Sequence, residues 1–285
     1  MSDGTISFPG LFGDNGINPP SYFSLGPLNI HWYGVIIALG FLLALTYCSR
    51  RAKSFGIKED DLYDMVLWGL PLGIVGARLY YIIFYPEMFR DAGFMDYIAV
   101  WNGGLAIYGG IIAAFLTVLV CTKLKKISTL AVLDIVSLGF LIGQSIGRWG
   151  NFMNREAHGC ETDLPWRMGL TYGGVTTCYH PTFLYESLWN ALGFVLLHFL
   201  SKKRKYDGEV FLAYLAWYGL GRAMIEGLRT DSLYIPGTQI RVSQLLAAVT
   251  CLASVIILIV NRTVIKHRPE NLFVNKAPVK TGAEE

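Results

Sequence analysis

Seven apolar stretches, each close to the length that crosses a membrane, divide this chain of 285 residues. They lie at residues 30–48, 62–84, 101–121, 129–147, 182–200, 209–227 and 241–261. A helix needs about 20 mostly apolar residues to span a bilayer. The second, third and sixth stretches contain or adjoin Arg78, Asn102, Arg222 and Glu226. The pattern predicts an all-α polytopic membrane protein with about seven membrane helices, or six if one enters only partway.

Composition supports a membrane protein. Hydrophobic residues make up 53% of the chain and charged residues only 16%, far from a soluble globular average. The first thirty residues contain no Lys or Arg and are broken by prolines, so no cleavable signal peptide is predicted there. The first membrane helix is expected to act as its own insertion signal.

The basic residues predict the orientation of the chain. Sixteen of the 24 fall in the segments 48–61, 122–128, 201–208 and 262–285, which an outside N-terminus would place inside. The other eight are all Arg. We therefore expect an N-out, C-in protein, with one membrane domain over residues 1–266 and a flexible inner tail over 267–285. The outer head, roughly 148–181, lies between the fourth and fifth helices, and a short strand is expected within 166–172.

Two of the five cysteines, Cys160 and Cys178, lie in this outer head. A disulfide is chemically allowed outside the membrane, and two free thiols are the alternative. No cysteine spacing resembles a zinc site, and no metal ligands are assigned.

Strongly polar side chains gather near the predicted outer ends of the helices. They are Tyr33, Arg78, Asn102, Tyr108, Arg148, Asn151, Asn154, Glu156, His180, Tyr185, Glu186, Arg222, Glu226 and Arg229. Such groups are costly to dehydrate at a membrane boundary and usually mark a site. The densest run is 147–159. One site at the membrane interface, able to bind an anion, is predicted in preference to a pore through the bilayer.

Several of these residues also have structural alternatives. Arg222 and Glu226 can form a structural ion pair, because a spacing of four places them on one helical face. Arg78 can hold helices together through backbone carbonyls. His180 can cap a helix before Pro181.

Glycines mark the second and third stretches. Gly69 and Gly73 favour close helix packing, since small residues let helices approach one another in lipid. A second group can serve either packing or the binding of an anion or lipid headgroup by exposed backbone N–H groups. This group comprises Gly103, Gly104, Gly109 and Gly110.

Four motifs in order along the chain carry a family resemblance. They are His-Trp-Tyr-Gly at 31–34, the polar run at 147–159, His-Pro-Thr-Phe-Leu-Tyr-Glu at 180–186, and the run at 221–229. With these motifs the chain resembles the bacterial phosphatidylglycerol–prolipoprotein diacylglyceryl transferases over essentially its whole length.

The resemblance implies an enzyme of the bacterial plasma (inner) membrane with its site toward the outer face. Such enzymes move the diacylglyceryl group of phosphatidylglycerol onto the lipobox cysteine thiol of a preprolipoprotein and release glycerol phosphate. The expected partners are therefore phosphatidylglycerol, the preprolipoprotein signal peptide with its lipobox, and membrane lipid. No cofactor, metal or nucleic acid is expected.

The chemistry suggests roles for the polar residues. Arg148 and Arg222 would clamp the phosphate, because a planar guanidinium can hold it bidentately. The expected catalytic residues are Arg148, Arg222, Tyr108, Asn151 and Glu156. The expected substrate-binding residues are Arg148, Asn151, Asn154, Tyr33, Gly159, Gly109, Gly110, His180 and Glu226.

One position departs from the family pattern. Many relatives carry His-Gly-Gly where this chain has Tyr108-Gly109-Gly110. The group that takes the thiol proton is therefore open between Tyr108, a carboxylate such as Glu156 or Glu226, and an arginine-rich site that lowers the thiol pKa directly.

Two other classes of function fit parts of the pattern. A transporter or channel would place charges near the bilayer midplane and show internal repeats, and no repeat is visible. A lipid-binding scaffold without catalysis is the third reading.

Overall fold

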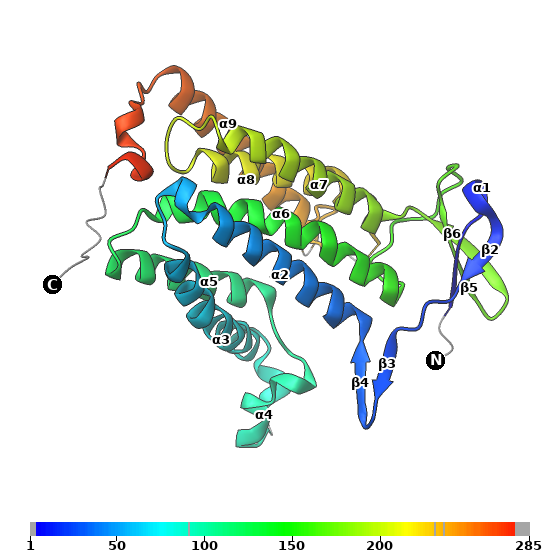
Figure 1. Ribbon diagram of the computed structural model, residues 1–285. Coiled ribbons are helices and arrows are strands. Elements are labelled where there is room, and N and C mark those ends of the chain that lie inside the picture. The colour runs from blue at the N-terminus through cyan, green and yellow to red at the C-terminus, as the bar shows by residue number, and fades with distance from the viewer. Residues whose placement is uncertain (1–3, 91, 231, 236, 277–285) are drawn as a thin grey trace. The chain divides into compact units, whose positions relative to one another are not determined.

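The computed structural model describes residues 4–90, 92–230, 232–235 and 237–276, and most of them are helical (Figure 1). The long helices are α2 (Trp32–Ala52), α3 (Glu59–Phe84), α5 (Ile107–Leu124), α6 (Thr129–Asn154), α7 (Thr182–Ser201), α8 (Glu209–Glu226) and α9 (Val242–Thr263). Two short helices are α1 (Pro9–Phe12) and α4 (Phe94–Ile98). Single 3-10 turns cover Lys53–Phe55, Pro86–Phe89, Val100–Asn102, Pro269–Asn271 and Phe273–Asn275.

Within the described residues, six of these long helices are long and apolar enough to cross a membrane, which agrees with a polytopic membrane protein. The exception is α8, the sixth predicted span. It carries Glu209, Arg222 and Glu226 within its 18 residues. Both carboxylates are buried in ion pairs, so protein contacts satisfy the charges of this helix. The exact number of spans and the orientation stay predictions.

The expectation of an all-α protein was too simple. Six strands are present in the described chain: β1 (Thr5–Phe8), β2 (Gly13–Ile17), β3 (Tyr22–Leu25), β4 (Leu28–His31), β5 (Met168–Tyr172) and β6 (Val175–Tyr179). They form an antiparallel sheet in the order β2-β1-β5-β6 and a separate hairpin of β3 and β4. The strand expected within 166–172 is β5. Strand β1 pairs with it across some 160 residues of sequence, a long-range pairing that local patterns do not reveal.

The described residues fall into two compact units, and each is described by itself. The first comprises the described parts of 1–48 and 134–269, and the second those of 49–133 and 270–285. The 3-10 turns at Pro269–Asn271 and Phe273–Asn275 belong to the expected inner tail, whose residues 277–285 lie outside the described residues.

In the first unit, glycines let α2 lie close to α6. A Cβ added to Gly150 would lie 2.7 Å from the ring of Tyr33, and one on Gly147 would lie 3.1 Å from Ile37. Ser145 of α6 and Ser187 of α7 join these two helices. The hydroxyl of each serine donates to the backbone carbonyl of the other at 2.9 Å. The start of α7 is therefore held against the end of α6.

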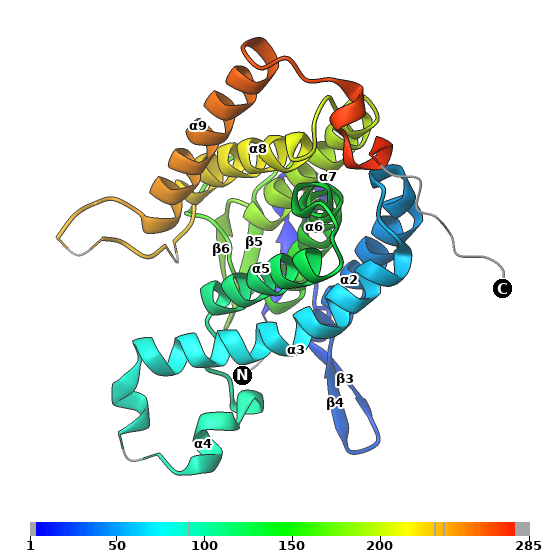
Figure 2. The same cartoon turned by 90° about the vertical axis from the view of Figure 1, so that its left-hand side faces the viewer.

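Helices α7 and α8 are joined by two stacked tryptophans. The rings of Trp189 and Trp217 lie 4.3 Å apart, and each indole N–H donates to the other residue's carbonyl at 3.0 Å. Gly221 and Gly193 make room for them, because a Cβ at either position would clash with an indole. Helix α9 lies beside α8 (Figure 2).

The buried Asp134 explains the one charge inside the fourth apolar stretch. Its carboxylate accepts the backbone N–H groups of Gly208 and Phe211, both at 2.8 Å. These donors are at the N-terminus of α8, where a carboxylate satisfies unpaired N–H groups and the helix dipole. Asp134 thus fixes where α8 begins.

In the second unit, α3 and α5 cross where glycines meet. A Cβ on Gly76 would lie 2.7 Å from the carbonyl oxygen of Gly109, and one on Gly109 would lie 2.3 Å from that of Gly76. Gly73 lies near Gly110, 3.8 Å from its carbonyl oxygen by the same measure. The prediction that Gly69 packs closely was wrong, because a Cβ there has nothing within 4 Å.

Candidate active site

Glu186, in the second turn of α7, is the centre of the polar site. The head positions the first turn of α7, because Ile6, Met168 and Leu170 of the sheet pack with Phe183 in a buried core. One turn further on, the carboxylate of Glu186 is only 4% exposed. The sheet of the head therefore sets the place of a buried charge at the start of α7.

Three guanidinium groups from different segments converge on this carboxylate. The Nη2 of Arg148, on α6, lies 2.5 Å from its Oε2. The Nη1 of Arg222, on α8, lies 3.3 Å from its Oε1, and the Nη1 of Arg229, just after α8, lies 3.2 Å from the same oxygen. A single acidic side chain thus holds together arginines that are up to 81 positions apart in the sequence.

Arg222 is also paired with Glu226 one turn along α8. Its Nη2 lies 2.6 Å from the Oε2 of Glu226, which is 2% exposed. The backbone carbonyl of Glu226 accepts a hydrogen bond from the guanidinium of Arg241. The predicted structural ion pair is therefore present, and it is part of the site, since it fixes Arg222 between two carboxylates.

The charge balance of this cluster favours an anion. The guanidiniums of Arg148, Arg222 and Arg229 face the two carboxylates of Glu186 and Glu226, which leaves one positive charge in excess. Three guanidiniums carry about 15 N–H donors, while two carboxylates have about eight lone-pair positions. The three arginine side chains are 10–21% exposed. The cluster can therefore accept a phosphate from outside.

A chain of amides extends from Arg148 to Glu156 at the end of α6. Arg148 donates to the Oδ1 of Asn151 at 3.3 Å, and the Nδ2 of Asn151 donates to Glu156 at 3.0 Å. Asn154 donates to the same oxygen at 3.4 Å. The backbone turns back here through a positive φ at Arg155 and at Ala157. Within the described contacts Glu156 thus reaches Arg148 through Asn151.

Tyr33, His180 and Gly159 lie around this cluster in the first unit. The ring of Tyr33 lies against Gly150, in the turn of α6 that carries Arg148 and Asn151. The Nδ1 of His180 lies 3.3 Å from the hydroxyl of Tyr185.

Gly159 is a close-contact position. A Cβ there would lie 2.7 Å from that of His180 and 3.0 Å from the carbonyl oxygen of Leu228. Its backbone forms a β-bridge with Arg229. The glycine thus lets the head approach the end of α8, and the bridge positions Arg229. Substrate contact by Gly159, His180 or Tyr33 stays a prediction.

Two other arginines, Arg155 and Arg78, hold neighbouring segments of the chain and lie outside the cluster. Arg155 is 7% exposed and makes hydrogen bonds to the N-terminal segment and to its own turn. Its acceptors are the carbonyls of Gly4, Met153 and Pro19, the hydroxyl of Ser21 and the Oδ1 of Asn18, at 2.5–3.4 Å. A guanidinium has five donors, and these acceptors use them all.

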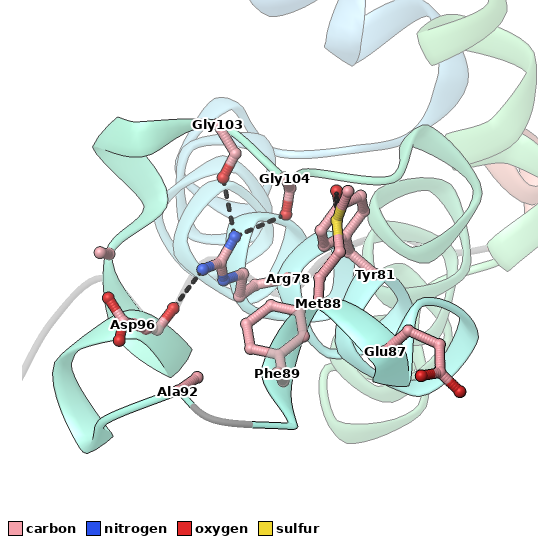
Figure 3. Close-up of a pocket in the computed structure, with 10 residues that line it drawn as sticks. Arg78, Tyr81, Glu87, Met88, Phe89, Ala92, Asp96, Gly103 and Gly104 are labelled. Atoms are coloured by element: carbon pink, nitrogen blue, oxygen red, sulfur yellow. Dashed lines mark hydrogen bonds between the residues drawn. The ribbon is translucent and has the colours of Figure 1, made fainter.

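Arg78, in the second unit, is the other. It donates to the carbonyl of Tyr97 at 3.1 Å. It also donates to the carbonyls of Gly103 and Gly104 at 2.7 and 2.9 Å, and to that of Asp96 (Figure 3). It lines a pocket of about 470 Å³ with Phe89, whose ring lies 5.3 Å from the guanidinium. The structural alternative for Arg78 is confirmed: it fastens the loop after α3 to that helix.

Tyr108, Gly109 and Gly110 also belong to the second unit, in the first turn of α5. The ring of Tyr108 is 42% exposed and lies 6.4 Å from that of Tyr80. Gly109 faces Gly76 of α3, and Gly110 faces Gly73. The packing alternative is therefore observed for both glycines, while a role in substrate binding or proton transfer stays a prediction.

Sequence reasoning assigned no catalytic or substrate-binding role to Glu186 or Arg229. Both were noted as polar residues near helix ends, but no local spacing connects Glu186 to an arginine 36, 38 or 43 residues away. Its place in the 180–186 motif was the available signal. The two head cysteines, Cys160 and Cys178, are free thiols.

The fold and the site define a polytopic membrane protein with an anion-accepting arginine–glutamate cluster. The chain belongs to the prolipoprotein diacylglyceryl transferase family, whose model matches residues 20–260. It is similar to proteins named phosphatidylglycerol–prolipoprotein diacylglyceryl transferase. That of Enterococcus faecalis is 45% identical over 268 residues, covering 90% of this chain and 94% of the relative. That of Limosilactobacillus reuteri is 45% identical over 255 residues (85% and 91%), and that of Listeria welshimeri 40% over 260 (87% and 92%).

Proposed function

We propose that this chain transfers the diacylglyceryl group of phosphatidylglycerol to a prolipoprotein, the first step of lipoprotein maturation. The observation that carries the active-site assignment is the convergence of three guanidiniums on the buried Glu186. A phosphate diester is the part of this lipid that such a cluster recognises, because guanidinium forks match phosphate oxygens.

The acceptor in this proposal is the lipobox cysteine of the prolipoprotein. Its sulfur forms a bond to the glyceryl carbon, and the bond from that carbon to the phosphate oxygen breaks. The electron pair leaves on that oxygen as glycerol phosphate, and a base takes the thiol proton. Arg148 and Arg222 stabilise the charge that develops on the leaving phosphate, since preorganised donors act most strongly where charge appears. Asn151, Asn154 and Tyr33 orient the headgroup.

The thiol proton has several possible acceptors. An unassisted thiol has a pKa of about 8.5 and is mostly protonated at neutral pH. Tyr108, Glu156 and Glu226 are the side chains that can take the proton, and the excess positive charge of the arginines can lower the thiol pKa. Tyr108→Phe keeps the ring and removes the hydroxyl, so unchanged turnover in this variant assigns the proton to another group.

The proposal places the site at the outer face of the bacterial plasma membrane, in one membrane domain over residues 1–266. The support is the division of basic residues along the chain, which predicts an outside N-terminus and an inside C-terminus. His180 and Gly159 of the head complete the proposed surface for the lipid headgroup and the signal peptide.

Arg148→Ala and Asn151→Ala test the assignment. Purified protein, labelled phosphatidylglycerol and a lipobox peptide give the turnover directly. We expect Arg148→Ala to lose about 100-fold or more in turnover, as when a donor to developing charge is removed. Asn151→Ala should also lose activity, because Asn151 links Arg148 to Glu156.

The matched control is Arg167→Ala, since among the described residues the Arg167 side chain bonds only to carbonyls of its own loop, those of Asp163 and Leu164. It should keep wild-type turnover, and all three variants should accumulate in the membrane. Wild-type turnover in both site variants would show that the clamp assignment is wrong. Lipid binding without product would support a scaffold, and flux across liposomes would support a transporter.

A further inference from the structure

A basic cavity lies at the end of α9, where the chain leaves that helix. It has a volume of about 450 Å³ and is lined by Lys205 from the turn before α8 and by Arg262, Lys266, His267 and Arg268 from the end of α9 and the segment after it. We refer to these five residues as the terminal basic pocket. Both segments belong to the first unit.

The terminal basic pocket is separate from the active site. Helix α8 carries Glu226, in the arginine cluster, at one end and Glu209, which contacts Arg262, at the other. These residues are 17 positions apart, so at about 1.5 Å per residue they lie roughly 25 Å from each other along the helix. A ligand in this pocket therefore cannot be the lipid held by Arg148.

One buried carboxylate gives the pocket its shape. Glu209 is fully buried, and its Oε1 lies 2.5 Å from the Nε of Arg262. Its Oε2 accepts the backbone N–H of Lys205 at 2.5 Å. Glu209 thereby fixes the end of α9 to the turn before α8 and neutralises one cation. Among the described residues, no carboxylate forms an ion pair with Lys205, Lys266 or Arg268.

Two polar atoms beside these cations have no partner in the described chain. The rings of Tyr206 and His267 stack 4.3 Å apart, and the Oη of Tyr206 and the Nε2 of His267 are both shielded from solvent without a hydrogen bond. Buried polar groups nearly always have a partner, so such atoms indicate a missing one. Burial, with the neighbouring Glu209, raises the pKa of Tyr206 to about 12, so its hydroxyl remains a donor.

We propose that the terminal basic pocket binds the phosphate group of an anionic phospholipid. Three unpaired cations favour an anion, and the pocket lies at the end of α9, a helix that is long and apolar enough to cross a membrane. Headgroup phosphates lie at this level of a bilayer, and basic pockets between membrane helices are suited to them. Free phosphate shares this chemistry, but it lacks the acyl chains that would lie along α9.

The test compares two double variants that remove the same charge. Lys205→Ala/Lys266→Ala removes two cations of the pocket, while Lys202→Ala/Lys203→Ala removes two from the same polar turn outside it. Native mass spectrometry of each purified protein, titrated with phosphatidylglycerol or phosphatidylcholine, counts the bound lipids. Inorganic phosphate is added in a parallel titration.

We expect the wild type and the control to hold one more phosphatidylglycerol than the pocket variant. The affinity of the pocket variant for this lipid should be lower by roughly tenfold or more. Lys205→Arg/Lys266→Arg should restore this lipid, and transferase turnover should be unchanged in all variants. Equal loss in both alanine pairs, equal retention of phosphatidylcholine, or displacement by equimolar inorganic phosphate would overturn the proposal. A pocket variant that does not fold, with the arginine pair failing to recover the lipid, would overturn it as well.

Discussion

Glu186 connects three arginines that the sequence keeps apart, and its burial explains the effect. A carboxylate that is 4% exposed is tolerated only when it is paired and hydrogen-bonded, so its three guanidinium partners offset the loss of water. The dependence is mutual, because the guanidiniums would otherwise repel one another. The positions of Arg148, Arg222 and Arg229 therefore depend on one side chain that need not touch the substrate.

Glu186→Ala should destabilise the protein by about 3–5 kcal/mol, as when one partner of a buried ion pair is removed. Turnover should fall with it, since the arginines lose their common anchor. Unfolding followed in detergent micelles and the lipobox-peptide assay measure the two effects. Glu87→Gln is the control, because its pair with Arg90 is about three-quarters exposed and should contribute less than about 1 kcal/mol. Equal stability of the two variants would contradict the role given to Glu186.

At the level of helices, glycine decides which pairs can approach closely. Gly76 of α3 and Gly109 of α5 each leave space for the other's backbone. Gly69, which is also on α3, faces nothing within 4 Å. Sequence patterns predicted close packing at Gly69 and Gly73 but could not assign a partner helix. A glycine's role depends on what lies opposite, which only the packed structure defines.

Gly76→Ala should therefore lower the thermal unfolding midpoint, while Gly69→Ala should leave it unchanged or raise it. The added methyl at Gly76 would lie 2.4 Å from the Cβ of Ala113 and 2.7 Å from a backbone oxygen, so the helices must separate. Overpacking of this kind typically costs about 1–3 kcal/mol. At Gly69 the same change has space, and alanine is the better helix former by about 1 kcal/mol. Similar effects at both positions would contradict close packing at Gly76.

For the chain as a whole, orientation is the property on which the proposed function depends most. The accessibility of cysteines can test it. Cys160 is exposed in the head, and Lys203 lies in the basic turn after α7 that is predicted to be inside. An N-out protein should react with a membrane-impermeant maleimide on intact cells, and Cys160→Ser should lose most of this label.

The converse position completes the test. Lys203→Cys in the Cys160→Ser background should be labelled only after the cells are lysed. If Lys203→Cys is labelled on intact cells while Cys160 of the wild type is not, the orientation is the reverse of the predicted one. The active site would then lie at the inner face. Labelling of both positions on intact cells would contradict the prediction that α7, the helix between them, crosses the membrane.

The length of the apolar stretches was sufficient to predict long membrane helices, because a bilayer imposes a nearly constant length on any helix that crosses it. The motif at 147–159 was likewise sufficient to predict that Arg148, Asn151, Asn154 and Glu156 lie together, because its members are close in sequence and share one helix end. Neither inference required a partner from elsewhere in the chain.

What depends on distant partners came only from the tertiary structure. Glu186 meets Arg148, Arg222 and Arg229 because α6, α7 and α8 pack together, and the N-terminal strands complete a head that seemed to need only residues 148–181. Arg78 was counted among the polar residues near the predicted site, and Asp134 is the one charge of the fourth apolar stretch, yet both satisfy backbone groups. Sequence patterns record what a residue can do, while burial and the groups opposite it decide which of those possibilities is used.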